Sequence, residues 1–198
     1  MLRSVRYSVG VDEVGRGCLA GPVTVAAVAI PARMRFFKLK DSKRLTAKQR
    51  EEWFGRARKH PMIFFSRANV YPKTIDRINV SNAANLAATR ALKKIAQQLK
   101  CPPEKLKVFL DGGLYLNFEA PLAKTVIKGD ERYNSIKLAS IVAKVNRDRI
   151  ISRNHRDYPA YGLAEHKGYG TKRHIRAIKK YGPAEIHRLT FIKNFYKI

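Results

Sequence analysis

Apolar positions along the chain fall into short runs that predict the strands of a sheet. Residues 23–30 (VTVAAVAI) form an almost unbroken apolar run rich in valine, which is typical of a buried strand. Shorter runs of the same character predict four further strands, at residues 6–11, 62–70, 107–110 and 124–127. The first two strands are joined by a glycine-rich segment and are expected to pair as a hairpin with a wide connection.

Helical patterns lie between these runs. Thr46 and Gln49 have the spacing of a capping box and predict a helix that continues to about residue 60. Residues 73–100 carry an apolar stripe and predict one long helix, and residues 135–153 and 171–181 predict two more. This order of elements indicates a mixed α/β sheet. Because no repeat or flexible linker interrupts the chain, we expect a single domain over residues 1–198, with a helical carboxyl-terminal region from about residue 171.

Acidic residues stand where three predicted strands end. Asp12 and Glu13 follow the first strand, Asp111 follows residues 107–110, and Asp130 comes soon after the last strand. Since ligands of open α/β sheets gather at strand ends, we expect these carboxylates to converge. Crowded carboxylates repel one another unless cations bind between them, and oxygen ligands select Mg²⁺ or Mn²⁺. Such a cluster predicts two-metal cleavage of a phosphodiester.

Each acid also has an ordinary interpretation when it is taken alone. Asp111 precedes a glycine and is typical of a turn. Asp130 precedes a predicted helix, where a negative charge is favourable. Asp12 and Glu13 are equally consistent with a solvated loop. The combination at three strand ends is what favours a metal site.

The charge of the chain is strongly unbalanced. Its 198 residues include 41 Lys and Arg against 15 Asp and Glu, a formal net charge of +26. Charge of this size opposes compaction, and nucleic acid is the expected partner. No apolar run reaches the roughly 18 residues of a membrane span, no signal-peptide pattern is present, and two cysteines are too few for a disulfide framework. We therefore expect a cytoplasmic protein, and a monomer.

The sequence that begins at Asp12 is much more specific than these patterns. Its first eleven residues, DEVGRGCLAGP, resemble the signature of the type 2 ribonucleases H, and of the bacterial ribonuclease HII family in particular. Further segments resemble the family in its own order along the chain: residues 41–45, 110–112, 128–130, 140–149, 166–171 and 186–188. The related ribonuclease HIII fits less well, because its additional amino-terminal substrate-binding domain has no room before Asp12.

The resemblance implies a fold and an activity. The fold is the ribonuclease H-like one, a five-stranded mixed sheet flanked by helices with a helical carboxyl-terminal part. The activity is that of a metal-dependent endoribonuclease that uses Mg²⁺ or Mn²⁺, with two metals expected. Its substrates would be the RNA strand of RNA/DNA hybrids and ribonucleotides embedded in duplex DNA, cut on their 5′ side to leave 3′-hydroxyl and 5′-phosphate ends. Such an enzyme would act in ribonucleotide excision repair and in primer and R-loop removal.

The resemblance also implies roles for individual residues. Four acids match the family's catalytic metal ligands: Asp12, Glu13, Asp111 and Asp130. The triplet Gly15-Arg16-Gly17 matches the family's sensor of the 2′-hydroxyl, the group that distinguishes RNA from DNA. Tyr169 matches the tyrosine that stacks on the sugar of the following deoxynucleotide. Four basic residues are expected to bind substrate phosphates: Lys43, Arg44, Lys144 and Arg147. A solvated basic helix face is the alternative for Lys144 and Arg147.

Two alternatives concern the protein as a whole and its tail. A non-catalytic basic RNA-binding protein would explain the charge of the chain but not the acids at three strand ends. At the carboxyl terminus, Ile192, Phe195 and Tyr196 have i, i+3, i+4 spacing. This short apolar stripe is consistent with a plug that docks onto a replication clamp, and more so with a segment that folds back onto the core.

Overall fold

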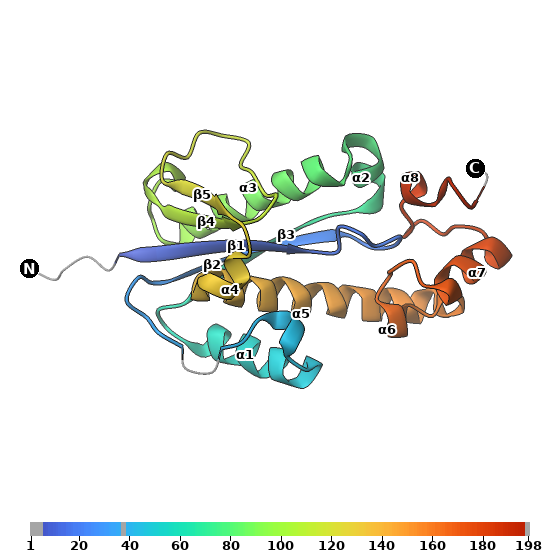
Figure 1. The fold of residues 1–198 in the computed structure, drawn as a ribbon, viewed down its shortest axis with the longest axis horizontal. Helices are drawn as coiled ribbons and strands as arrows, with labels where there is room; N and C mark the ends of the chain where they lie inside the picture. Colours follow the sequence, from blue (N-terminus) through green and yellow to red (C-terminus); the bar gives the residue numbers. More distant parts are fainter. Residues whose placement is uncertain (1–5, 37–38, 197–198) are drawn as a thin grey trace, which may run out of the picture.

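A five-stranded mixed sheet forms the centre of the computed structural model, which describes residues 6–36 and 39–196 (Figure 1). Its strands are β1 (Tyr7–Val14), β2 (Val23–Pro31), β3 (Phe64–Val70), β4 (Lys107–Asp111) and β5 (Ala123–Val126). They are arranged in the order β3-β2-β1-β4-β5. The pairs β1–β2 and β2–β3 are antiparallel, whereas β4 runs parallel to both β1 and β5. The predicted mixed sheet and its wide first hairpin are confirmed.

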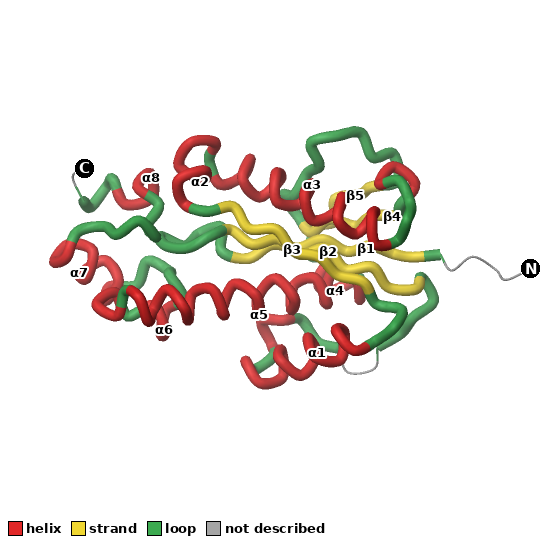
Figure 2. The backbone as a smooth tube through the Cα atoms, turned by 180° about the vertical axis from the view of Figure 1, so that it is seen from behind, coloured by secondary structure: helices red, strands yellow, loops and turns green. Residues whose placement is uncertain are grey.

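Helices cover both faces of this sheet. The larger helices are α1 (Ala47–Lys59), α2 (Pro72–Ile78), α3 (Val80–Gln98), α5 (Asn134–Asp157) and α7 (Lys172–Tyr181). The short ones are α4 (Gly129–Arg132), α6 (Leu163–His166) and α8 (Leu189–Ile192). Figure 2 shows α3 on one side of the sheet and α5 with α1 on the other. None of the helices in the described ranges is both long enough and apolar enough to cross a membrane.

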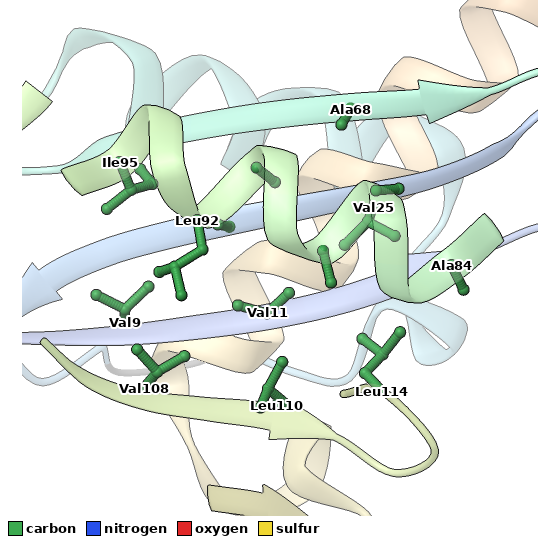
Figure 3. Packing of buried hydrophobic residues seen from close by; sticks show 14 of the residues in the cluster. Val9, Val11, Val25, Ala68, Ala84, Leu92, Ile95, Val108, Leu110 and Leu114 are labelled. Atoms are coloured by element: carbon green, nitrogen blue, oxygen red, sulfur yellow. The ribbon is translucent and has the colours of Figure 1, made fainter. Parts of the chain in front are cut away.

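The alternation of side chains along β1 directs its residues toward two different layers. Val9 and Val11 face α3 and pack with Leu92 of that helix and with Val108 of β4 (Figure 3). Gly10 belongs to the other face, where a side chain would clash with the backbone at the start of α5. The close approach of α5 to β1 therefore requires a glycine at this position.

One predicted helix is broken in the structure. The predicted helix over residues 73–100 is instead two helices, α2 and α3, separated at Asn79. Asn79 adopts a φ of +63°, and its side-chain oxygen accepts a hydrogen bond from the amide of Asn82 at 3.0 Å, which caps α3. Asparagine tolerates this left-handed backbone and caps helices well, so one residue ends the first helix and starts the second.

The carboxyl-terminal helices pack around a hydrophobic cluster of their own, next to the end of the sheet. Two isolated antiparallel β-bridges, between Cys18 and Tyr169 and between Ala20 and His187, connect these helices to the segment that follows β1. Ile192 is fully buried in the cluster, and Phe195 and Tyr196 pack against it. The predicted folding back of the tail is confirmed for these side chains; residues 197–198 of the predicted tail lie outside the described residues.

Candidate active site

A cleft of about 330 Å³ lies at the end of β1 and brings together most of the predicted site residues. Its lining includes these predicted residues: Asp12, Glu13, Gly15, Arg16, Gly17, Lys43, Asp111, Lys144 and Tyr169. Ser42 and Ser140 also line it, and their hydroxyl oxygens lie 2.7 Å apart. Sequence analysis singled out neither serine, although Ser42 belongs to the family-like segment 41–45 and Ser140 to the segment 140–149. Asp130, Arg44 and Arg147 do not belong to this lining.

Asp12 lies inside β1, opposite Ala26 of β2, and is 5% exposed. Its Oδ1 accepts a hydrogen bond from the amide of Glu13 at 2.7 Å. Burial raises the pKa of Asp12 well above its usual range, and the charges of Glu13 and Asp111 raise it further. A carboxylate in this position is therefore unfavourable without a compensating cation.

Glu13 is the next residue of β1, and its side chain meets Arg16. Its Oε1 lies 3.3 Å from Nη1 of Arg16, while its Oε2 is buried without any hydrogen-bond partner. Burial raises the pKa of Glu13, although the charge of Arg16 opposes this shift. A buried carboxylate oxygen without a partner costs free energy and is suited to receive a ligand.

Asp111 and Asp130 lie side by side at the ends of different elements. Asp111 is the last residue of β4, and its Oδ1 accepts from the amide of Gly129 at 2.8 Å. Burial raises the pKa of Asp111, and the charge of Asp130 adds to this shift. Asp130 is buried in α4, with its Oδ2 3.3 Å from Nζ of Lys43.

The predicted placement of these acids needs a correction. Only Asp111 ends a strand: Asp12 and Glu13 lie within β1, which continues to Val14, and Asp130 lies in α4, beyond the end of β5. β1 is longer than predicted because its polar residues still pair with β2 through backbone hydrogen bonds, which a hydrophobicity pattern does not reveal.

The donor chemistry of the site fits a divalent cation, although the ligands are not gathered around one point. In the portion of the chain that the structure describes, no three His, Cys, Asp or Glu side chains lie close enough to hold a metal ion. Two carboxylates are paired with side-chain cations instead, Glu13 with Arg16 and Asp130 with Lys43. The Lys43 side chain is 80% exposed, so its ion pair is easily exchanged. Buried carboxylate oxygens, one of them without a partner, are ligands of the kind that Mg²⁺ or Mn²⁺ prefers.

The Gly15-Arg16-Gly17 triplet forms one wall of the cleft. Gly15 has a φ of +92°, and a side chain there would clash with the guanidinium of Arg147. Gly17 has open space where its side chain would be, so a ligand can approach its backbone closely. Arg16 is held by Glu13 and donates to the hydroxyl of Ser81 at 3.1 Å. The triplet is therefore a fixed loop with one open position.

Two buried arginines support this loop, and their contacts correct one prediction. Arg147 is fully buried and donates to the carbonyl oxygens of Pro22, Ala20 and Lys167 at 2.8–3.0 Å. Its guanidinium is therefore occupied by the backbone, and the predicted binding of a substrate phosphate by Arg147 is wrong. The prediction failed because a helix-borne arginine in a basic chain carries no local sign of burial.

Arg188 is the most important residue that the sequence did not single out. It is fully buried, and it donates to the carbonyl oxygens of Gly15 at 2.7 Å, Arg16 at 2.8 Å and Gly21 at 2.9 Å. Burial lowers the pKa of Arg188 to about 10, so the side chain stays charged at neutral pH. The only available signal was its place in the family-like segment 186–188.

The remaining predicted substrate ligands differ in their placement. Tyr169 is 43% exposed and faces the cleft beside Cys18. Lys144 lines the cleft and forms an ion pair with Asp148 at 2.9 Å. Arg44 is exposed at the end of the 3₁₀ turn Ser42–Arg44 and lies outside the cleft lining. Tyr169 and Lys144 thus line the cleft, and Arg44 lies outside it.

Three histidines form a stacked cluster beneath Tyr169. The rings of His166 and His174 stack at 4.3 Å, and the Nε2 atoms of His174 and His187 lie 3.1 Å apart. The Nδ1 of His174 lies 2.9 Å from the carbonyl oxygen of Tyr169. Each of the three rings also lies within hydrogen-bond distance of a backbone carbonyl oxygen.

The buried histidines contribute stability that is lost in mild acid. Burial lowers the pKa of His174 from 6.5 to about 4, so between these values the unfolded chain binds more protons than the folded one. The histidine contribution is complete above pH 6.5 and is lost as the pH falls toward 4, by about 3 kcal/mol. The difference between the wild type and His174→Gln in urea unfolding from pH 8 to pH 4 measures this loss, because the buried acids of the cleft change stability in the opposite direction. His174→Gln is expected to flatten the slope below pH 6.5, whereas the control His60→Gln, at the end of α1, keeps it; equal slopes in both variants would contradict the assignment.

The sheet order and its flanking helices define the ribonuclease H-like fold, with acids within β1 and at the end of β4. Solved structures agree. The ribonuclease HII of Archaeoglobus fulgidus in complex with PCNA is 26% identical with a TM-score of 0.71, covering 96% of this chain and 97% of that one. Ribonuclease H2 from Pyrococcus horikoshii OT3 is 26% identical with a TM-score of 0.66, covering 97% of this chain and 100% of that one.

Sequence comparison identifies the family. The family model "Ribonuclease HII" matches residues 9–194. A ribonuclease HII from Caldicellulosiruptor saccharolyticus is 46% identical over 192 residues, covering 97% of this chain and 90% of the relative. One from Bacillus anthracis is 41% identical over 198 residues, covering 98% of this chain and 73% of the relative. The chain belongs to the ribonuclease HII family and is therefore a ribonuclease H, an endonuclease.

Proposed function

We propose that this protein is a metal-dependent endonuclease that hydrolyses the RNA strand of RNA/DNA hybrids and cuts on the 5′ side of ribonucleotides embedded in duplex DNA. The products would carry 3′-hydroxyl and 5′-phosphate ends. One observation carries this proposal: the same cleft is lined by buried carboxylates and by a loop whose backbone is open at Gly17. A scissile phosphate at Asp12 would thereby lie next to a group that can detect the neighbouring ribose.

The carboxylates are proposed to hold Mg²⁺ or Mn²⁺, which would activate the attacking water and stabilise the departing 3′-oxygen. The carboxylates of Asp12 and Asp111 lie close enough for the charge of Asp111 to raise the pKa of Asp12. Glu13 presents its free Oε2 to orient the water. Asp130, once Lys43 moves to a substrate phosphate, completes the ligand set. Lys43 is long and exposed, so this exchange replaces one ion pair by another.

Recognition of a ribonucleotide is proposed to depend on the loop and on Tyr169. The backbone at Gly17 is open and can donate or accept a hydrogen bond at the 2′-hydroxyl. The half-exposed ring of Tyr169 can stack on a following sugar that lacks this oxygen. Lys144 and other basic residues of the surface would provide salt-dependent affinity without sequence preference.

The biological setting is proposed by extension from this chemistry. Removal of single ribonucleotides from DNA, and of primers and R-loops, would take place in the cytoplasm, where the two cysteines of the protein stay reduced. The Archaeoglobus relative was solved with PCNA. A similar clamp contact here would require Ile192, Phe195 and Tyr196 to leave the cluster in which they pack. We therefore favour a structural role for the tail and propose a monomeric enzyme.

A basic RNA-binding protein without activity, the alternative that the charge of the chain leaves open, disagrees with the family to which the chain belongs. It would not require Asp12 and Glu13 to be buried against their electrostatic cost beside a basic surface. The deciding experiment incubates a labelled DNA duplex carrying one ribonucleotide with the protein and Mg²⁺ or Mn²⁺, beside an all-DNA duplex. We expect one cut on the 5′ side of the ribonucleotide, absent from the all-DNA duplex and absent with EDTA. Tight binding with no cut under either metal would overturn the proposed substrate and metal dependence.

A further inference from the structure

Two open grooves lie along the edge strand β3, outside the cleft. The first, of about 770 Å³, is bounded by β3 and α3, and the second, of about 700 Å³, by β3, α1 and α5. Arg67, Asn69 and Tyr71 line both grooves, so the two meet at the free edge of the sheet. Figure 2 shows the backbone of β3 running between α3 and α5.

The grooves are positively charged, and their carboxylates are already paired. The first groove is lined by Arg67, Arg90, Lys93 and Lys94 and has no acidic residue among its lining. The second is lined by these cations: Arg67, Arg149, Arg153, Arg156 and Lys167. Its two acids are Glu51, paired with Arg149 at 2.6 Å, and Asp148, paired with Lys144. A continuous basic surface remains for a polyanion.

The uncharged residues at the meeting point indicate which polyanion fits. Tyr71 is 54% exposed, at the amino-terminal cap of α2, in the middle of the basic surface. Basic grooves interrupted by exposed aromatic rings are typical of surfaces that bind single-stranded nucleic acid, because the ring stacks on a base and the cations follow the phosphates. A base inside a duplex is already stacked on both sides and offers no free face to Tyr71.

The second groove also continues from the cleft. Lys144 lines the cleft and Asp148, one helical turn further along α5, lines the groove, with the two side chains joined as an ion pair. Lys167 of the groove and Tyr169 of the cleft are two residues apart. A strand that leaves the cleft past Lys144 therefore enters the groove without crossing the protein.

We propose that the two grooves around β3 form a second nucleic-acid site, which binds a single-stranded extension through its phosphates and through a base stacked on Tyr71. The identification of this strand as an extension of the cleaved substrate rests on the proposed function. Binding of a single strand to the grooves does not, and it can be measured by itself.

The test measures fluorescence anisotropy of a labelled DNA single strand of about 20 nucleotides, without ribonucleotide and in EDTA, over a range of salt concentrations. Arg67→Gln/Arg153→Gln removes one cation of the meeting point and one of the second groove. We expect about tenfold weaker binding and a slope of log affinity against log salt that is smaller by about 1.4, the amount for two lost phosphate contacts. Tyr71→Leu is expected to weaken binding about tenfold with little change of slope.

The matched control is Lys105→Gln/Lys124→Gln, which removes two exposed cations that line neither groove. It should bind the strand as the wild type does. Equal losses in the groove and control variants would mean that only the overall charge matters and would overturn the proposal. The proposal would also be overturned by a second result: Tyr71→Leu binds the single strand as the wild type does, and Arg67→Gln/Arg153→Gln loses as much affinity for a blunt duplex as for the single strand. The occupant of the grooves would then be a duplex.

The outcome also separates this site from the proposed function. The probe has no ribonucleotide and no metal, so a loss confined to the groove variants supports the second site even for a protein that fails to cut. The converse result is that the wild type cuts at the ribonucleotide while the groove variants bind the single strand normally. That result would support the proposed function and overturn the second nucleic-acid site. Circular dichroism of each variant establishes that the exposed substitutions leave the fold intact.

Discussion

Replacing Asp12 by asparagine is expected to abolish cleavage while the protein remains folded and bound to its substrate. The amide has the shape of the carboxylate, and its oxygen can still accept the hydrogen bond from the Glu13 amide. What is lost is the negative charge at the centre of the proposed metal site. We expect kcat/KM to fall about a thousandfold or more, since charge stabilisation by a bound metal is worth several kcal/mol in the transition state.

Binding and stability should change in the opposite direction. Burial and two neighbouring acids make the charge of Asp12 costly in the folded protein, so its removal should leave the free energy of unfolding unchanged or higher. Affinity for the duplex, measured in EDTA, should be equal or tighter because one negative charge has gone. Asp157→Asn, at the exposed end of α5, is the matched control and should cut as the wild type does. Normal cleavage by Asp12→Asn would remove the acid from the mechanism.

The local patterns of the sequence predicted the elements that local interactions form. The capping box of Thr46 and Gln49 is present with both of its reciprocal hydrogen bonds, and the helix ends at Lys59 as expected. The valine-rich run became β2, which is buried along nearly its whole length. In these segments the hydrophobic pattern and the backbone preference agree, so neither needs tertiary information to be interpreted.

Positions that depend on distant partners were predicted less well. Asp130 belongs to a short helix whose place is fixed by the bond between Asp111 and the Gly129 amide, a contact between residues of different elements. Lys43 lies next to Asp130 although 87 residues separate them. The strand-end rule indicated the region of the sheet in which the acids lie, but not the ion pairs that Glu13 and Asp130 form with Arg16 and Lys43.

The buried arginines mark the clearest limit of sequence interpretation. Arg147 and Arg188 satisfy backbone carbonyl groups more than a hundred residues away in the chain, in the segment that connects β1 to β2. A chain with 41 basic residues gives no local reason to select two of them as interior residues. Their role follows from hydrogen bonding in three dimensions, because each supplies donors to carbonyls that no strand or helix satisfies.

Substitution of Arg188 is expected to produce the largest loss of stability outside the hydrophobic core. Arg188→Ala leaves the carbonyl oxygens of Gly15, Arg16 and Gly21 without their shared donor and opens a cavity beneath the loop. A buried acceptor without a partner costs about 1–3 kcal/mol, so a loss of about 4 kcal/mol or more is expected in urea unfolding. Lysine cannot restore it, because an ammonium group lacks the planar fork that reaches several carbonyls at once.

The functional consequence separates loop support from general stability. The measurement is made at a temperature where Arg188→Lys is still folded but the loop of residues 15–17 is no longer held. The ratio of the cutting rate at a single embedded ribonucleotide to the cutting rate in an RNA strand should change. Only cutting at the single ribonucleotide depends on one 2′-hydroxyl sensed at Gly17. The control Arg173→Ala breaks an exposed ion pair with Glu165 on the carboxyl-terminal helices and should cost less than about 1 kcal/mol. An Arg188→Lys enzyme with the stability and substrate ratio of the wild type would show that the loop is held by its backbone alone, and that the buried guanidinium only fills space behind the cleft.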